Sequence, residues 1–122
     1  MGKRVLVIED DFLNRMMFCA VLREGGYDVE EVTDERLTLR EAEQFGPDLI
    51  VLDIHLPYVS GIDIIKLLKS SEKLRSIPVL AVTGYVGKGE EQKVRSAGAS
   101  GYLAKPVSMK PLLDAVGGLL PH

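Results

Sequence analysis

Acidic residues, a threonine and a lysine follow separate apolar runs of this chain, in a pattern that suits phosphate chemistry. Four runs are followed or closed in turn by Glu9 and Asp10, by Asp53, by Thr83, and by Lys105. Three carboxylates in one crevice repel each other unless a cation neutralises them. Oxygen-only ligands suit Mg²⁺, which keeps several waters and often meets a phosphate. A lysine and a hydroxyl beside them would hold phosphoryl oxygens, and one carboxylate could form an acyl phosphate.

The elements that would bring these residues together alternate between strand and helix. Apolar runs without polar alternation predict strands buried on both faces, and helical spacing follows each run. The strands are expected at 5–8, 27–32, 49–52, 79–82 and 102–104. The first helix is expected from about residue 13 until Gly25 stops it, and the second from a cap at Thr33 or Asp34 to about Phe45. The last three helices are expected at 62–73, at about 89–97, and after a cap at Ser108. Such alternation predicts a five-stranded, doubly wound parallel sheet with helices on both faces. Sites in these sheets form at the carboxyl ends of the strands, where the polar residues lie.

Composition and length exclude several other classes of protein. The chain has 122 residues, so we expect one domain over residues 1–122. Its 46% hydrophobic and 27% charged residues are typical of a soluble globular protein, and its net charge of −3 argues against a nucleic-acid partner. No run approaches a membrane span or the apolar part of a signal peptide. The lone cysteine, Cys19, allows no internal disulfide and fits a reducing compartment, so we expect a cytoplasmic protein.

The stretches around these residues resemble the receiver domain of bacterial two-component response regulators, over essentially the whole chain. The matching stretches are 5–10, 47–53 with Pro57 and Gly61 behind them, 78–83 and 98–106. The resemblance implies a flavodoxin-like fold with strand order 2-1-3-4-5 and five helices. Within the family the sequence looks most like stand-alone, DivK-type regulators of alphaproteobacteria, on Glu9-Asp10, Leu13-Asn14 and residues 77–83.

Carried over residue by residue, the resemblance implies a phosphorylation site centred on Asp53. Asp53 would accept the phosphoryl group from a histidine kinase or a histidine phosphotransfer protein. Glu9, Asp10 and Asp53 would hold Mg²⁺, with the backbone carbonyl of His55 as a further ligand. Lys105 would contact the phosphoryl group. The protein would then catalyse its own labelling and slow dephosphorylation, as a signalling switch and not as a metabolic enzyme.

The resemblance also implies a switch that reads the phosphoryl group. Thr83 would contact the phosphoryl group, and Tyr102 would be the aromatic residue that moves with it. The affected surface would be the fourth helix, the fifth strand and the fifth helix, where a downstream protein would bind. The Lys105–Pro106 peptide bond is expected to be cis.

Several other residues are expected to have structural roles. The apolar stripe predicted for the first helix consists of Leu13, Met16, Met17, Ala20 and Val21, and it is expected to fill the core. Cys19 falls within the same helix and is expected to be a packing residue. Asp11 is expected to be exposed or to cap that helix. Glu35 and Thr38 stand where the family often has Gly and Ala, which leaves the packing of the second helix open. Residues 84–89 place glycines around a lysine but lack the Walker spacing, so we expect a loop there.

Three alternatives stay open. A flavin-binding electron carrier has the same strand order, but it needs neutral phosphate donors where this chain has Glu9 and Asp10. The chain could be an interaction module that keeps the receiver fold without phosphorylation, or a receiver fragment of a hybrid histidine kinase. Met1 directly before the first strand favours a complete protein, and the chain ends soon after the fifth helix. Output is therefore expected through protein contacts or phosphoryl relay.

Overall fold

The fold is a five-stranded parallel sheet between two layers of helices. The computed structural model describes residues 2–85, 87 and 89–120. The strands are β1 (Arg4–Ile8), β2 (Asp28–Val32), β3 (Leu49–Asp53), β4 (Val79–Thr83) and β5 (Gly101–Ala104). They pair in the order β2-β1-β3-β4-β5, so the predicted fold class and strand order are confirmed.

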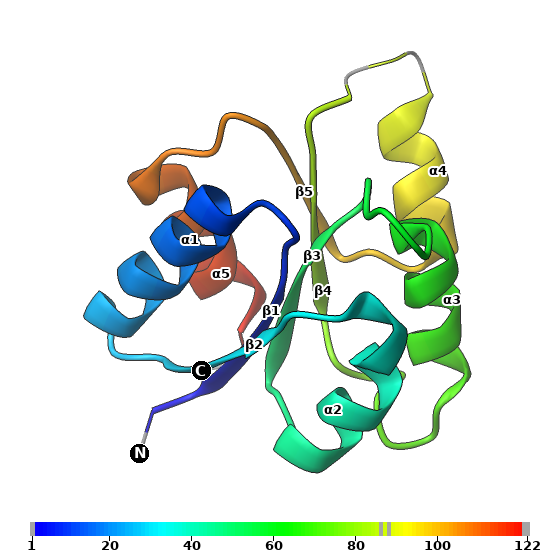
Figure 1. Cartoon of the computed structure of the whole chain (residues 1–122), viewed down its shortest axis with the longest axis horizontal. Helices are drawn as coiled ribbons and strands as arrows, with labels where there is room; N and C mark the ends of the chain where they lie inside the picture. Colours follow the sequence, from blue (N-terminus) through cyan, green and yellow to red (C-terminus); the bar gives the residue numbers. More distant parts are fainter. Residues whose placement is uncertain (1, 86, 88, 121–122) are drawn as a thin grey trace.

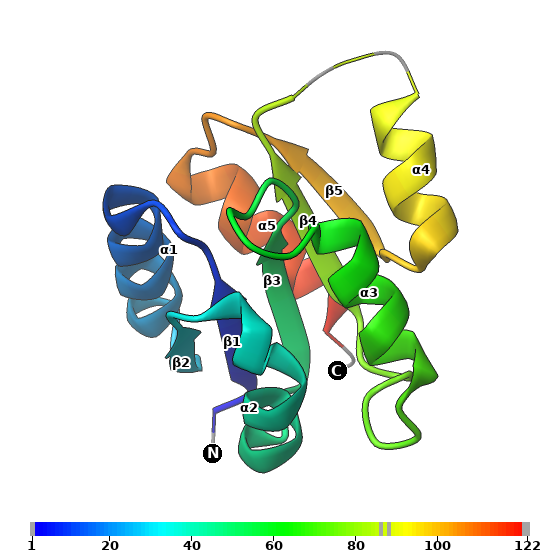
Figure 2. The same ribbon diagram turned by 45° about the vertical axis from the view of Figure 1, so that its right-hand side comes forward.

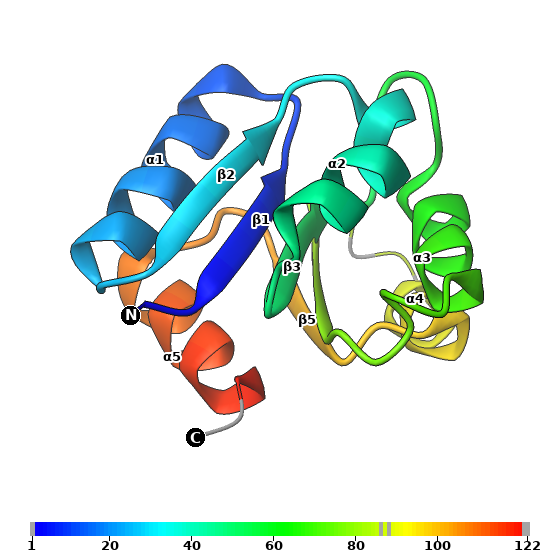
Figure 3. The same cartoon turned by 90° about the horizontal axis from the view of Figure 1, so that it is seen from below.

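The helices divide between the two faces of the sheet (Figure 1). They are α1 (Phe12–Glu24), α2 (Thr38–Phe45) after a 3₁₀ turn η1 (Glu35–Leu37), α3 (Gly61–Ser70), α4 (Glu90–Ala97) and α5 (Met109–Leu119). Seen along the sheet, α1 and α5 cover one face, and α2, α3 and α4 cover the other (Figure 3). Every residue of β3 and β4 is buried, as continuous apolar runs require.

Each face of the sheet has its own hydrophobic core. Successive strand residues point to opposite faces, so Val5 and Val7 pack under α1 and α5, whereas Leu6 and Ile8 pack under the other helices. None of the helices in the described part of the chain is long and apolar enough to cross a membrane.

The buried face of α1 corrects the expectation for the first helix. Met16 is 54% exposed and Leu13 is 70% exposed, so these two do not fill the core. The buried residues are Phe18, Cys19, Val21 and Leu22, with Met17 packed partly against them. Helical spacing allowed two apolar stripes on α1, and only packing against β1 selects between them. Cys19 packs in the core as expected, and burial raises the pKa of its thiol to about 11.

The end of α3 also differs from the sequence expectation. The helix was predicted to reach Lys73 but ends at Ser70. Ser71 has an extended backbone, and its amide donates to the Leu68 carbonyl at 3.2 Å. The chain then turns, which brings it to the start of β4.

The second helix begins with the 3₁₀ turn η1. Asp34, not Thr33, caps it, because its side chain accepts the Arg36 amide at 3.0 Å. Ser108 holds the N-cap position of α5 as expected, but its side chain makes no capping hydrogen bond with the described residues. The expected loop at 84–89 contains Lys88, which lies outside the described residues.

Candidate functional site

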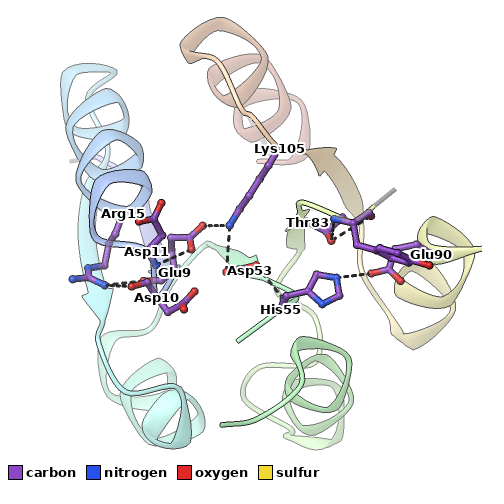
Figure 4. A network of polar contacts seen from close by, with 10 residues as sticks. Glu9, Asp10, Asp11, Arg15, Asp53, His55, Thr83, Glu90 and Lys105 are labelled. Carbon is purple, nitrogen blue, oxygen red and sulfur yellow. Dashed lines mark hydrogen bonds and ion pairs between the residues drawn. The ribbon is translucent and has the colours of Figure 1, made fainter. Parts of the chain in front are cut away.

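The predicted site residues meet at the carboxyl edge of the sheet. Glu9 and Asp10 directly follow β1, and Asp53 is the last residue of the neighbouring strand β3. Thr83 is the last residue of β4, and Lys105 directly follows β5. Parallel strands end at the same edge, so residues far apart in the sequence converge there (Figure 4).

Three carboxylates form a compact cluster at this edge. Glu9, Asp10 and Asp53 each offer an oxygen, and these oxygens lie within 4.8 Å of one another. Glu9 is 1% exposed and Asp53 is 3% exposed, whereas Asp10 faces solvent. Lys105 Nζ lies 2.9 Å from Glu9 Oε1 and 3.4 Å from Asp53 Oδ2. One ammonium cannot neutralise three carboxylates, so the donor set fits a hard divalent cation such as Mg²⁺.

The protonation of this cluster is shifted by its surroundings. Burial raises the pKa of Asp53 to about 7, helped by Glu9, while Lys105 acts in the opposite direction. Burial lowers the pKa of Lys105, but Glu9 and Asp53 outweigh it, so the net shift is upward. Lys105 therefore stays charged beside the two buried acids.

The loop after β3 is folded closely over Asp53. The His55 amide donates to Asp53 Oδ1 at 3.1 Å, and the Gly61 amide donates to the Ile54 carbonyl at 2.9 Å. A Cβ at Gly61 would lie 2.5 Å from Ile54 Cα, so only glycine fits this approach. On the opposite side of the site, Lys105–Pro106 is cis, as expected.

Thr83 and Tyr102 contact the same backbone segment. Thr83 is fully buried, and its hydroxyl accepts the Tyr85 amide at 3.1 Å. The Tyr102 hydroxyl donates to the Tyr85 carbonyl at 3.4 Å. Tyr102 also lines an open cavity of about 760 Å³ against α4, with Arg95 on its wall. The two proposed switch residues are therefore linked through Tyr85.

Two buried acids near the site were not assigned a role from the sequence. Glu90, the first residue of α4, is 8% exposed, and its Oε1 lies 3.3 Å from His55 Nε2 (Figure 4). Glu35 is 5% exposed, and its Oε2 accepts the Tyr58 amide at 2.7 Å. For Glu35, the departure from the family pattern was a signal in the sequence that the residue has a special role. Glu90 gave no such signal, because acidic residues are common in the first turn of a helix, where the helix dipole favours them.

The geometry also places Asp11 and the ring of His55 relative to the carboxylate cluster. Asp11 is exposed at the N-cap position of α1, and its amide donates to Glu9 Oε2 at 3.1 Å. Within residues 2–85, 87 and 89–120, Glu9, Asp10 and Asp53 are the group with metal-ligand spacing, and His55 does not join it through its ring.

Comparison with known proteins defines the class to which this fold and site correspond. Residues 5–117 match the response regulator receiver domain family, and the chain belongs to this family. Its relatives include the polar-differentiation response regulator DivK of Brucella ovis, 38% identical over 120 residues that cover 98% of both chains. The DivK protein of Brucella anthropi is 37% identical over the same lengths. The likeness to DivK-type regulators inferred from the sequence is therefore confirmed.

Solved structures agree with this assignment. The chemotaxis protein CheY4 of Vibrio cholerae superposes with a TM-score of 0.92 at 28% identity, covering 98% of this chain and 100% of that one. The receiver domain of a sensor histidine kinase from Pseudomonas aeruginosa gives a TM-score of 0.88 at 30% identity over 98% of both chains. That structure has a magnesium ion coordinated in its active-site cleft. The present chain is thus a receiver domain of two-component signalling with an acidic pocket typical of magnesium binding, and its family implies a histidine kinase or phosphotransfer partner.

Proposed function

We propose that this receiver domain is a phosphoacceptor that takes a phosphoryl group onto Asp53 and then changes its contacts with a protein target. The main observation in support is the position of Asp53. This residue is buried at the end of β3, and Lys105 Nζ lies 3.4 Å from its Oδ2. Glu9 and Asp10 complete the cluster. The donor is a phosphohistidine on a histidine kinase or a phosphotransfer protein, and the cytoplasm is the expected compartment.

The transfer forms one bond and breaks one. An oxygen of the Asp53 carboxylate attacks phosphorus, the phosphorus–nitrogen bond of the phosphohistidine breaks, and the leaving imidazole keeps the electron pair and takes a proton from solvent. Lys105 holds a phosphoryl oxygen as charge develops there, and Thr83 can offer its hydroxyl. Water then takes the phosphoryl group from the acyl phosphate, which releases inorganic phosphate and returns Asp53 to its carboxylate form.

Glu9, Asp10, Asp53 and the backbone carbonyl of His55 would hold Mg²⁺. The cation would neutralise the acids and the incoming phosphoryl oxygens. Support comes from the oxygen-only donor set and from the burial of Glu9 and Asp53, which leaves these two acids little water to solvate them.

The donor domain is proposed to dock on α1. This helix begins directly after the acidic residues, and three of its apolar side chains face solvent: Phe12 at 61%, Leu13 at 70% and Met16 at 54% exposure. A domain that delivers a phosphohistidine to Asp53 must lie against this edge of the sheet. Phe12 and Leu13 follow the acidic residues directly in the chain, so a donor at this edge could contact them. Burial of apolar surface there would stabilise the encounter.

Treatment with acetyl phosphate and Mg²⁺, followed by intact mass measurement, tests the acceptor. The wild-type protein should gain one phosphoryl mass, and Asp53→Asn should gain none. Asp11→Asn is the matched control, because Asp11 is an exposed acid at the same edge but outside the carboxylate cluster. Full labelling of Asp53→Asn would move the acceptor elsewhere, and a wild-type protein that stays unlabelled would favour an unphosphorylated interaction module.

A further inference from the structure

We infer that Glu35 is a positioning residue for the metal-binding side of the site, acting through the loop between β3 and α3. This loop comprises residues 54–60 and includes His55. The inference rests on the proposed function, because the carbonyl of His55 is the proposed metal ligand. Glu35 itself lies outside the carboxylate cluster.

The contact that carries the inference joins segments far apart in the chain. The Tyr58 amide donates to Glu35 Oε2 at 2.7 Å, across 23 positions of sequence. Glu35 is 5% exposed, although Tyr58 on the loop surface is 69% exposed. A carboxylate that has lost its water depends on the hydrogen bonds that replace it, and a bond from an amide to a charged oxygen is stronger than a neutral one. The interaction is therefore costly to break and fixes the middle of the loop.

A second contact from the same turn holds the same loop residue. The Arg36 guanidinium lies 4.7 Å from the centroid of the Tyr58 ring. Asp34 orients Arg36 through two side-chain bonds, of 2.9 Å and 3.0 Å. The buried hydroxyl of Thr38 donates to the Glu35 carbonyl at 2.7 Å and ties η1 to the start of α2. The turn thus holds Tyr58 by its backbone through Glu35 and by its ring through Arg36.

The anchoring of the loop explains why Glu35 would affect the metal. The loop is fixed at its start by the bond from the His55 amide to Asp53, and at its end by the bond from the Gly61 amide to Ile54. Tyr58 is the anchor between them, and the carbonyl of His55 lies in the part of the chain between the first anchor and Tyr58. Groups that orient a ligand without touching the metal commonly change metal affinity by about 10-fold or more when removed.

The experiment compares Glu35→Ala with Glu35→Gln by magnetic resonance titration of Mg²⁺ and by labelling with acetyl phosphate. Glu35→Ala should weaken Mg²⁺ binding by about 10-fold. It should also raise the Mg²⁺ concentration needed for half-maximal labelling, while labelling at saturating Mg²⁺ stays close to the wild-type level. Glu35→Gln keeps an oxygen that can accept the Tyr58 amide, so its Mg²⁺ affinity should stay close to the wild type. Glu43→Ala removes an exposed acid of α2 that bonds Ser71 instead, and serves as the charge-matched control.

Each outcome bears on a different claim. Wild-type Mg²⁺ affinity in Glu35→Ala, or an equal loss in Glu35→Gln, overturns the role of Glu35 and leaves the acceptor assignment intact. An unlabelled wild-type protein defeats the proposed function, whereas Mg²⁺ binding still reports on Glu35. If Glu35→Ala does not fold, amide exchange in the wild-type protein decides. Slow exchange at Tyr58 supports the anchor, and exchange as fast as in an unprotected loop refutes it.

Discussion

Asp53 is a buried carboxyl whose neighbours act in opposite directions. Burial and Glu9 raise its pKa to about 7, whereas Lys105 favours the ionised form. The unfolded chain would release the same proton near pH 3.9. Between these values the native state binds more protons than the unfolded state, so the stability that this group contributes is present at low pH and falls as the pH rises to about 7. Above about pH 7, the negative charge that Asp53 carries therefore lowers the stability of the metal-free fold.

Asp53→Asn should therefore stabilise the protein in metal-free buffer, in a way that depends on pH. The variant mimics the neutral side chain, so its advantage in the free energy of unfolding should grow from about pH 4 to about pH 7 and then level off, at a few kcal/mol. Urea unfolding at a series of pH values measures this difference. Asp114→Asn, an exposed acid of α5, should show no such trend. A pH-independent difference at Asp53 would contradict the argument.

Near the site, hydrogen bonds to Tyr85 connect the end of β4 with β5. Thr83 and Tyr102 both bond the backbone of Tyr85, at 3.1 Å and 3.4 Å. A phosphoryl group on Asp53 that draws the Thr83 hydroxyl toward itself would remove one of these bonds. The segment at Tyr85 and the ring of Tyr102 would then have a second arrangement available, as a switch requires.

Thr83→Ala should separate phosphorylation from this structural change. We expect the variant to accept the phosphoryl group but to lose most of the change at α4 and β5, because the hydroxyl that links the two is gone. Amide chemical shifts with and without beryllofluoride, a phosphoryl mimic, measure it over residues 85–110. Thr83→Ser keeps the hydroxyl and should behave like the wild type. Equal shifts in Thr83→Ala and the wild type would refute the coupling.

The contact between Glu90 and His55 joins α4 to the loop after β3. Glu90→Gln should weaken this restraint, so that amides in the first turn of α4 exchange faster with solvent. His55 is half-exposed, so the free energy of unfolding should change by less than about 1 kcal/mol. Hydrogen exchange resolved by residue measures the effect. Glu91→Gln, which removes an exposed pairing with Arg95, is the control. Unchanged exchange in α4 of Glu90→Gln would show that the contact does not restrain the helix.

For the molecule as a whole, the site lies between two separate surfaces, each of which is proposed to bind a protein. In Figure 2, α1 lies on one side of the sheet edge and α4 lies on the other. The exposed apolar side chains of Phe12, Leu13 and Met16 belong to α1, and the cavity beside Tyr102 lies against α4. Under the proposed function, a donor bound at α1 would leave α4 and β5 accessible. Mutations could then alter transfer of the phosphoryl group to Asp53 without altering the contacts of the target protein, and the reverse.

Leu13→Ser should impair loading from a protein donor without impairing the chemistry. Labelling by a histidine kinase or phosphotransfer partner should slow severalfold, because the donor loses apolar contact. Labelling by acetyl phosphate should stay at the wild-type rate, because that small donor does not need α1. Leu67→Ser, at a half-exposed leucine of α3, is the control. Loss of acetyl phosphate labelling in Leu13→Ser would indicate damage to the site itself.

Local sequence signals determined the fold class and the main site of this protein. Continuous apolar runs predicted the strands other than the more polar β2, and the parallel order placed Asp53, Lys105 and the acids after β1 at one edge. These signals can be read from short segments of sequence. A strand that is buried on both faces appears as an apolar run without alternating polar residues. The carboxyl ends of parallel strands meet at one edge of the sheet, so the residues that follow the strands are placed there.

Tertiary structure alone decided features that depend on contacts between distant segments. In the folded protein Leu13 and Met16 face solvent, whereas Phe18 and Leu22 are buried. Both pairs have the spacing of residues on one helical face, so the spacing alone does not decide which pair is buried. Tertiary structure also brought Glu35 to the Tyr58 amide. Helical periodicity states which residues share a face but not which face meets the sheet. The role of a buried acid likewise depends on the donor that reaches it, which lies elsewhere in the chain.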